Sequence, residues 1–177
     1  MLEDIKEVLL TRKQIEGKIK ELAGDLNEIY IDKNPIILGL LKGSVMFIGE
    51  LMKSLDFKLE LDFMDVSSYI GTYSTSEIKI LKDMEIDVKD RHVIIAEDII
   101  DTGQTLFRIV EILKIRGATT VEIVALIDKP HARIMNIKAD YVGFEIPKKF
   151  VVGYGLDYNE SYRNLPFIGV LKESIYT

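Results

Sequence analysis

Carboxylates, hydroxyls and a glycine lie close together in one segment of the chain, Val93 to Leu106 (VIIAEDIIDTGQTL). The segment begins with four apolar residues, as in a strand that is buried on both faces of a parallel sheet. We expect Glu97 and Asp98 to leave the sheet at the carboxyl end of this strand, with Asp101 following in a loop. The apolar residues that then recur at helical spacing are Leu106, Ile109, Val110 and Leu113. This order predicts a strand, an acidic pair and a loop that opens a helix.

The loop consists of Thr102, Gly103, Gln104 and Thr105 and is suited to binding a phosphate group. The free backbone N–H groups and the positive dipole end of a helix attract an anion, and glycine permits close approach. The nearby carboxylates would repel a phosphate unless they contact sugar hydroxyls or a hydrated divalent cation. Mg²⁺ prefers such oxygen ligands and keeps several of its waters. The segment therefore predicts a site for a ribose phosphate that carries further phosphate groups.

This segment resembles the phosphoribosyl-pyrophosphate (PRPP) motif of the type I phosphoribosyltransferases, and its form EDIIDTG is similar to the hypoxanthine-guanine branch. The resemblance implies that Thr102 to Thr105 hold the 5-phosphate of PRPP and that Asp101 is the general base. Glu97 and Asp98 would contact ribose hydroxyls or metal-bound water. The alternative is an ordinary connection between a strand and a helix, with Asp101 as the helix cap.

Two further segments resemble loops of the same family. Lys42 and Gly43 follow an expected strand, Ile36 to Leu41, and resemble the pyrophosphate loop, in which the bond matching Leu41 to Lys42 can be cis. The alternative is a plain turn into a helix capped by Ser44. The residues Ser67, Ser68 and Tyr69 match the start of the flexible catalytic loop, although Ile70 stands where glycine is common. The alternative there is a solvated hairpin tip.

The base site is implied by matches near the carboxyl end of another expected strand and in the segment Phe150 to Pro166. Lys129 would donate to the oxygen at purine position 6, which favours 6-oxopurines over adenine. Phe150 would stack on the base, and Arg163 would contact the pyrophosphate. The implied purine site consists of Ile99, Lys129, Phe150, Val151 and Asp157, and the implied Mg²⁺ ligands are Glu97, Asp98 and Asp157. Alternatively, Phe150 and the valines are plain core, and Arg163 forms a surface ion pair.

Alternating strands and helices predict an α/β fold of the phosphoribosyltransferase type, with a mostly parallel central sheet flanked by helices. Thr11 and Gln14 predict a capping box that opens a helix running to about Tyr30. Leu59 to Ser67 predicts a strand in which the apolar Leu59, Leu61 and Phe63 alternate with the acidic Glu60 and Asp62. We expect a single domain, 1–177, with its core at about 30–140. The short apolar runs from Tyr141 onward predict a small antiparallel hood, 141–177, completed by part of the N-terminus.

Composition excludes several classes of function. The 177 residues carry a net charge of −6, which argues against general binding to nucleic acid or a membrane surface. The absence of cysteine excludes disulfides and thiol nucleophiles, and with only two histidines we expect no zinc site. The sequence has no apolar run of about 20 residues and no signal-peptide order at its start, so we expect a cytoplasmic protein.

The resulting hypothesis is a purine-salvage enzyme that transfers the 5-phosphoribosyl group of PRPP to N9 of hypoxanthine or guanine, with Mg²⁺. The products would be IMP or GMP and pyrophosphate, and the resemblance implies a homodimer or homotetramer. A regulator that keeps the PRPP site as a sensor is the alternative, but the chain shows no basic excess or added DNA-binding domain. A phosphoacceptor receiver domain would need an acidic pair near the first strand, which the sequence lacks.

Overall fold

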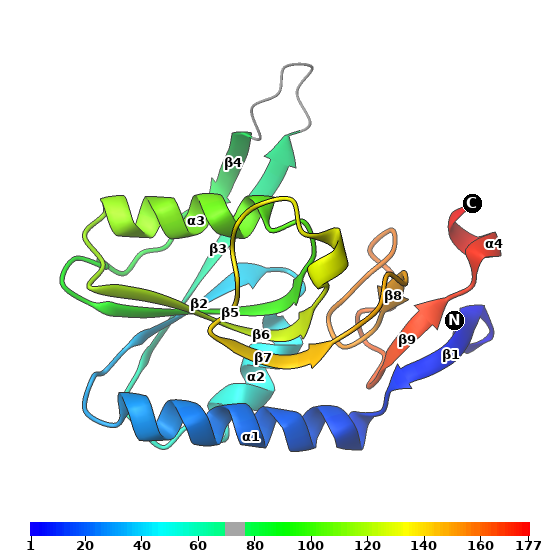
Figure 1. The fold of residues 1–177 in the computed structure, drawn as a ribbon, viewed down its shortest axis with the longest axis horizontal. Helices are drawn as coiled ribbons and strands as arrows, with labels where there is room; N and C mark the ends of the chain where they lie inside the picture. Colours follow the sequence, from blue (N-terminus) through cyan, green and yellow to red (C-terminus); the bar gives the residue numbers. More distant parts are fainter. Residues whose placement is uncertain (70–76) are drawn as a thin grey trace.

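The computed structural model describes residues 1–69 and 77–177 as a main sheet covered by helices on both faces, with a small second sheet at one end (Figure 1). The main sheet has six strands in the order β4-β3-β2-β5-β6-β7, and only β4 runs antiparallel to its neighbour. Its strands are β2 (Ile36–Leu41), β3 (Glu60–Tyr69), β4 (Glu77–Lys82), β5 (His92–Ile100), β6 (Thr120–Asp128) and β7 (Tyr141–Glu145). The predicted α/β class and mostly parallel sheet are confirmed.

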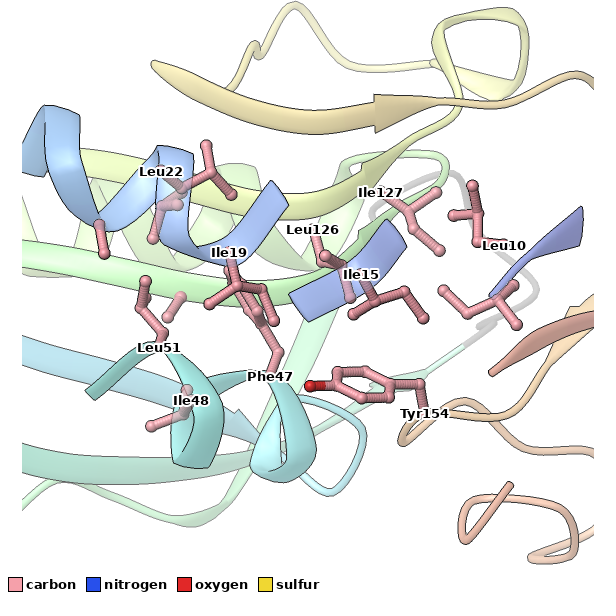
Figure 2. Close-up of a cluster of buried hydrophobic side chains, with 14 of the residues drawn as sticks. Leu10, Ile15, Ile19, Leu22, Phe47, Ile48, Leu51, Leu126, Ile127 and Tyr154 are labelled. Carbon is pink, nitrogen blue, oxygen red and sulfur yellow. The ribbon is translucent and has the colours of Figure 1, made fainter. Parts of the chain in front are cut away.

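Helix α3 (Gln104–Ile115) covers one face of the main sheet, whereas α1 (Arg12–Tyr30) and α2 (Val45–Met52) cover the other (Figure 1). The predicted capping box opens α1, because Thr11 and Gln14 each bond the other's backbone N–H. One apolar face of α1 is buried against α2 and the sheet, and Figure 2 shows Ile15 and Ile19 beside Phe47 and Leu51. Burial of these apolar side chains therefore holds α1 and α2 together on the same face of the main sheet.

The second sheet forms the hood and joins the two ends of the chain. Its order is β1-β9-β8, all antiparallel, with β1 (Ile5–Leu10), β8 (Val151–Val152) and β9 (Ile168–Leu171). Short helices η1 (Leu2–Asp4), η2 (Pro130–Ala132) and α4 (Glu173–Tyr176) complete the fold. Buried Tyr154 follows β8 and lies near Ile15 and Phe47, so the hood packs on the same core as α1 and α2 (Figure 2).

Two predicted strand boundaries were wrong. Tyr141–Glu145 is β7 of the main sheet, parallel to β6, and not part of an antiparallel hood. It is an edge strand of half-buried residues, which gives it the short interrupted pattern of an antiparallel strand. Glu97 and Asp98 do not leave the sheet either, since β5 continues to Ile100 and stays paired with β6. The strand therefore ends four residues later than predicted.

Two side chains also point differently from their predictions. Ser44 does not cap α2 with its hydroxyl, which instead donates to the Leu40 carbonyl at 2.6 Å. In β3 Asp62 is buried and Leu61 is exposed, the reverse of the predicted alternation. The Asp62 carboxylate accepts the backbone N–H groups of Phe63, Glu85 and Ile86, which supply the partners that a buried charge requires.

The expected flexible loop begins within a strand. Ser67, Ser68 and Tyr69 are the last residues of β3 and pair with β4 in an antiparallel ladder. The rest of the predicted loop, from Ile70 to Ser76, lies outside the described residues. Within the described ranges, no helix combines the length and apolar character that crossing a membrane requires.

Candidate functional site

Two adjoining hollows lie at the carboxyl edge of the main sheet, where open α/β sheets bind ligands. A cleft of about 410 Å³ lies between this edge and the hood, and a smaller hollow of about 130 Å³ lies beside the start of α3. Ile99 and Asp101 line both. Of the predicted site residues, Lys42, Gly43, Asp98, Lys129, Phe150, Val151, Asp157 and Arg163 line the cleft, and Glu97, Thr102, Gly103, Gln104 and Thr105 line the smaller hollow. Ser67 is not among the residues that line either hollow.

The phosphate loop, Asp101 to Thr105, turns directly from β5 into α3. Gly103 is the N-cap residue, in the left-handed region at φ +79°, and no side chain caps the helix. This excludes the alternative in which Asp101 serves as a helix cap. The Gln104 N–H reaches the Thr102 hydroxyl at 3.4 Å, and the first helical bond runs from Phe107 N–H to the Gly103 carbonyl at 2.9 Å. The open first turn of α3 can therefore bind an anion.

The acidic pair is divided between the two faces of the sheet, because successive strand residues point in opposite directions. Glu97 lines the phosphate-loop hollow, and Asp98 lines the cleft against Gly43. A Cβ at Gly43 would lie 1.8 Å from the Asp98 Oδ2, so any larger residue there would displace the Asp98 carboxylate. Burial raises the pKa of Asp98 to about 6, although the Ile99 N–H opposes this. Burial, followed by the charge of Asp98, raises the pKa of Glu97 well above its usual range.

The carboxylates fit a site that is completed by ligand or water. The Glu97 Oε2 is buried and has no hydrogen-bond partner among the described residues, so it can meet a donor or a cation that a ligand brings into this hollow. No group of three or more acidic, histidine or cysteine side chains in the described ranges is arranged to hold a metal ion alone. Mg²⁺ is usually bound by only one or two protein carboxylates, with water and substrate phosphates as its other ligands, and this site offers such carboxylates.

Lys129 and Asp101 lie side by side at the floor of the cleft. The Lys129 Nζ is 3.7 Å from the Asp101 Oδ2, and the side chains are 12% and 54% exposed, respectively. Lys129 follows β6 and Asp101 follows β5, which are paired neighbours, so the parallel register brings the two together. The pair offers a hydrogen-bond donor and an acceptor at adjacent positions.

The cationic corner of the cleft consists of Lys42, Arg163, Asp157 and Glu160. The peptide bond between Leu41 and Lys42 is cis. Arg163 pairs with Asp157 at 2.9 Å, and the Glu160 carboxylate bridges Arg163 at 3.3 Å and the Lys42 Nζ at 3.1 Å. The sequence reading missed Glu160. Its spacing of three residues from Arg163 was the available signal, whereas its contact with Lys42 crosses 118 positions.

The apolar residues that line the cleft match both interpretations from the sequence in part: one placed Phe150 on the base, and the other placed Phe150 and the valines in the core. Val152 is fully buried and Val151 nearly so, as the core alternative predicted. Phe150, however, is 38% exposed and lines the cleft. Its ring stacks on Tyr176 at 4.8 Å between centroids and meets the edge-on ring of Tyr158 at 5.7 Å. An exposed, supported aromatic ring suits a planar ligand.

Comparisons with known proteins agree on one family. Residues 7–159 match the model of the phosphoribosyl transferase domain. The hypoxanthine-guanine phosphoribosyltransferase of Bacillus subtilis (strain 168) is 51% identical over 177 residues, covering 99% of this chain and 98% of that protein. The bifunctional protein TilS/HprT of Listeria monocytogenes (serotype 4b, strain F2365) is 51% identical over 178 residues, covering all of this chain, which spans 28% of that protein's length. A solved hypoxanthine phosphoribosyltransferase from Staphylococcus aureus superposes with a TM-score of 0.97 at 50% identity, covering 100% of this chain and 97% of that one.

Proposed function

Because this chain belongs to the phosphoribosyltransferase family, we propose that it transfers the 5-phosphoribosyl group of PRPP to N9 of a 6-oxopurine. Hypoxanthine and guanine are the proposed acceptors, with IMP or GMP and pyrophosphate as products. A relative named hypoxanthine-guanine phosphoribosyltransferase is 51% identical over nearly the whole chain, which supports this choice of acceptors.

The observation that carries the proposal is the pairing of Lys129 with Asp101 at 3.7 Å. In a 6-oxopurine, O6 and N7 are neighbours on one edge of the base. The Lys129 ammonium would donate to O6, and the Asp101 carboxylate would take the proton from N7 as N9 attacks the ribose. Adenine has an amine in place of O6, so it offers the ammonium no comparable acceptor.

The remaining residues would bind different parts of PRPP in the two hollows. The open first turn of α3 would bind the 5-phosphate, and Glu97 and Asp98, on opposite sides of β5, would accept hydrogen bonds from ribose hydroxyls. Lys42 and Arg163 would bind the departing pyrophosphate and offset its growing negative charge. Phe150 and Ile99 would hold the base plane, with Val151 beside its edge. Ser67, Ser68 and Tyr69 would begin the catalytic loop that closes over the diphosphate.

Mg²⁺ is part of the proposal, since PRPP carries a concentrated negative charge. Glu97, Asp98 and Asp157 would hold it, directly or through water, and the buried unpaired oxygen of Glu97 supports this. When bound, the ion would neutralise pyrophosphate charge. We expect chelation with EDTA to abolish nucleotide formation and added Mg²⁺ to restore it.

Two further predictions from the sequence belong to this proposal. The first is assembly as a homodimer or homotetramer. The exposed Val45 and Met46 at the start of α2 support such an interface, and light scattering would measure the subunit number. The second is a cytoplasmic location, supported by the absence of cysteine from the chain.

The decisive experiment offers the purified protein PRPP and Mg²⁺ with hypoxanthine, guanine, xanthine or adenine, and follows nucleotide and pyrophosphate. We expect nucleotide from hypoxanthine and guanine but not from adenine. PRPP binding without product from any base would instead favour the sensor alternative. Efficient use of adenine would contradict the proposed role of Lys129.

A further inference from the structure

Arg133 is a nearly buried cation behind the phosphate loop, and the proposed reaction does not use it directly. It lies at the end of η2, in the segment that connects β6 to β7. Only 13% of its side chain is exposed, although arginine is rarely buried without dedicated partners. Such a residue needs an explanation beyond surface charge.

Three of the four partners of the Arg133 guanidinium are backbone carbonyls, and two of these belong to Ile100 and Asp101 at the end of β5. The Nε donates to the Asp101 carbonyl at 3.1 Å, and Nη2 lies 3.5 Å from the Ile100 carbonyl. The Nη1 donates to the Ile137 carbonyl at 2.8 Å, and Nη2 also pairs with the Asp128 carboxylate. The fork thus ties the end of β5 to the end of β6 and to the following segment.

The residues next to Arg133 extend the same contact by one position. The N–H groups of Ile134 and Met135 both donate to the Thr102 carbonyl, at 3.0 and 3.2 Å. Carbonyls of three consecutive residues, from Ile100 to Thr102, are therefore held by a single neighbouring segment. Gly103 packs closely on it too, because a Cβ there would lie 3.0 Å from the Arg133 Cδ.

The Asp101 side chain has few contacts of its own to fix its position. It is 54% exposed, and among the described residues its carboxylate pairs with Lys129 at 3.7 Å. Its placement must come from the backbone on either side, which is the part that Arg133 holds. A misplacement of about 1 Å can cost about 10²-fold in rate.

We propose that Arg133 is a positioning residue that acts through the phosphate-loop backbone to aim Asp101 at the base and to keep the first turn of α3 open for the 5-phosphate. This inference rests on the proposed function. It assigns Arg133 no contact with substrate. The loss of Arg133 should therefore lower kcat mainly while Asp101 can act as a base, whereas any effect on binding of the 5-phosphate should appear in the KM for PRPP in either background.

A double-mutant cycle tests this dependence. Arg133→Met retains an apolar side chain against Gly103 and removes the hydrogen bonds. We expect it to lower kcat about 30-fold in the otherwise native enzyme, but less than threefold in the Asp101→Asn background. An equal fall in kcat in both backgrounds would overturn the inference, because a general structural defect does not depend on the base.

The Lys variant and a matched control separate the possible causes. Arg133→Lys keeps the charge but cannot span all four oxygens, so we expect its kcat to lie between those of the native enzyme and Arg133→Met. It also replaces the Met variant in the cycle if that protein does not fold. The control is Arg116→Met, which removes a bidentate pair with Asp83 (2.8 and 2.6 Å) beyond the far end of α3 and should leave kcat unchanged. If Asp101→Asn alone leaves kcat unchanged, the proposed base is wrong and the inference falls with it. A slow Asp101→Asn enzyme with additive effects overturns only the role of Arg133.

Discussion

The phosphate loop and the cationic corner lie in the same site, but different interactions hold them in place. Backbone hydrogen bonds from one segment fix the phosphate loop, including two to the Thr102 carbonyl. In the cationic corner, side chains hold one another, with the exposed Glu160 bridging the exposed Lys42 and the half-buried Arg163. A ligand entering the loop meets donors that need no rearrangement, whereas one entering the corner must replace an internal carboxylate. We therefore expect mutations to weaken binding in the loop and, at one position, to strengthen it in the corner.

The backbone of the phosphate loop should tolerate change least. In Gly103→Ala the new Cβ would lie 2.7 Å from the Ile137 Cγ2, at a left-handed φ that an L-residue adopts at a cost of about 1–2 kcal/mol. We expect the KM for PRPP to rise about 100-fold, since the loop must shift to relieve both problems.

Gly117→Ala is the matched control for Gly103→Ala. Gly117 lies just beyond the opposite end of α3, at φ +89°, and its nearest neighbour would be 3.4 Å away. The control should lower Tm while leaving the KM for PRPP near that of the native enzyme. Equal KM values for the two variants would show that strain alone, and not the loop geometry, decides the effect.

Asp98 lines the cleft together with Lys42 and Arg163 and precedes the phosphate loop in the chain. Because its carboxylate is buried, we expect it to lower the stability of the protein. Its pKa of about 6 lies above the unfolded value of 3.8, so the folded protein binds more protons between these values and stability falls as pH rises through this range. Asp98→Asn retains an oxygen for the Ile99 N–H, which donates at 2.9 Å. We expect it to raise stability at pH 8 by about 2 kcal/mol, or about 6 °C in Tm, and to lower activity.

The pH dependence checks the cause of this gain. At pH 5 most of the native Asp98 is already protonated, so the difference in Tm from the Asn variant should shrink. Asp62→Asn is the control, because backbone hydrogen bonds and Lys82 outweigh burial and lower the pKa of Asp62. That substitution should destabilise the protein at pH 8. Stabilisation by both substitutions would contradict the assigned difference between the two buried carboxylates.

Lys129 tests whether the floor of the cleft selects the base. We expect Lys129→Met to lower kcat/KM about tenfold for hypoxanthine and to leave the low value for adenine unchanged. Lys53→Met, which removes an exposed partner of Glu50 at 2.5 Å, is the control. An unaltered ratio of hypoxanthine to adenine use would remove Lys129 from selectivity.

Features that depend on neighbouring positions in the chain could be predicted from the sequence. The buried start of β5 and the opening of α3 lie within one segment of the chain, as does the Thr11 capping box. Strand β7 could not be assigned correctly, because the half-buried residues of an edge strand do not reveal whether their partner runs parallel. The prediction for Asp62 failed similarly, since its three backbone donors come partly from beyond β4.

The supporting contacts of the site could not be predicted because their partners are distant in sequence. Arg133 meets the Asp101 carbonyl across 32 positions, and Glu160 meets Lys42 across 118. The residues proposed to contact ligand could be recognised from their chemistry and spacing, whereas Arg133 and Glu160 reach the site only once the chain has folded. The functional roles of the predicted site residues remain predictions for the experiments above.

Glu160 offers the smallest effect and the most unusual direction. Its carboxylate accepts from Lys42 at 3.1 Å and from Arg163 at 3.3 Å, the two cations proposed to bind pyrophosphate. The hydrogen bond from Lys42 is the main reason that the pKa of Glu160 lies below its usual value, so the side chain is an anion at neutral pH. An internal anion competes with an incoming one for the same donors.

Glu160→Gln should therefore lower the KM for PRPP and the inhibition constant of pyrophosphate, each about threefold, because exposed ion pairs are individually weak. Glu7→Gln, which neutralises an exposed partner of Lys149 at 2.6 Å, should change neither constant. Initial rates over a range of PRPP and pyrophosphate concentrations measure both constants. Weaker binding in Glu160→Gln would mean that Glu160 orients the two cations for the ligand and does not compete with it. The cationic corner would then be preorganised for its ligand, as the phosphate loop is.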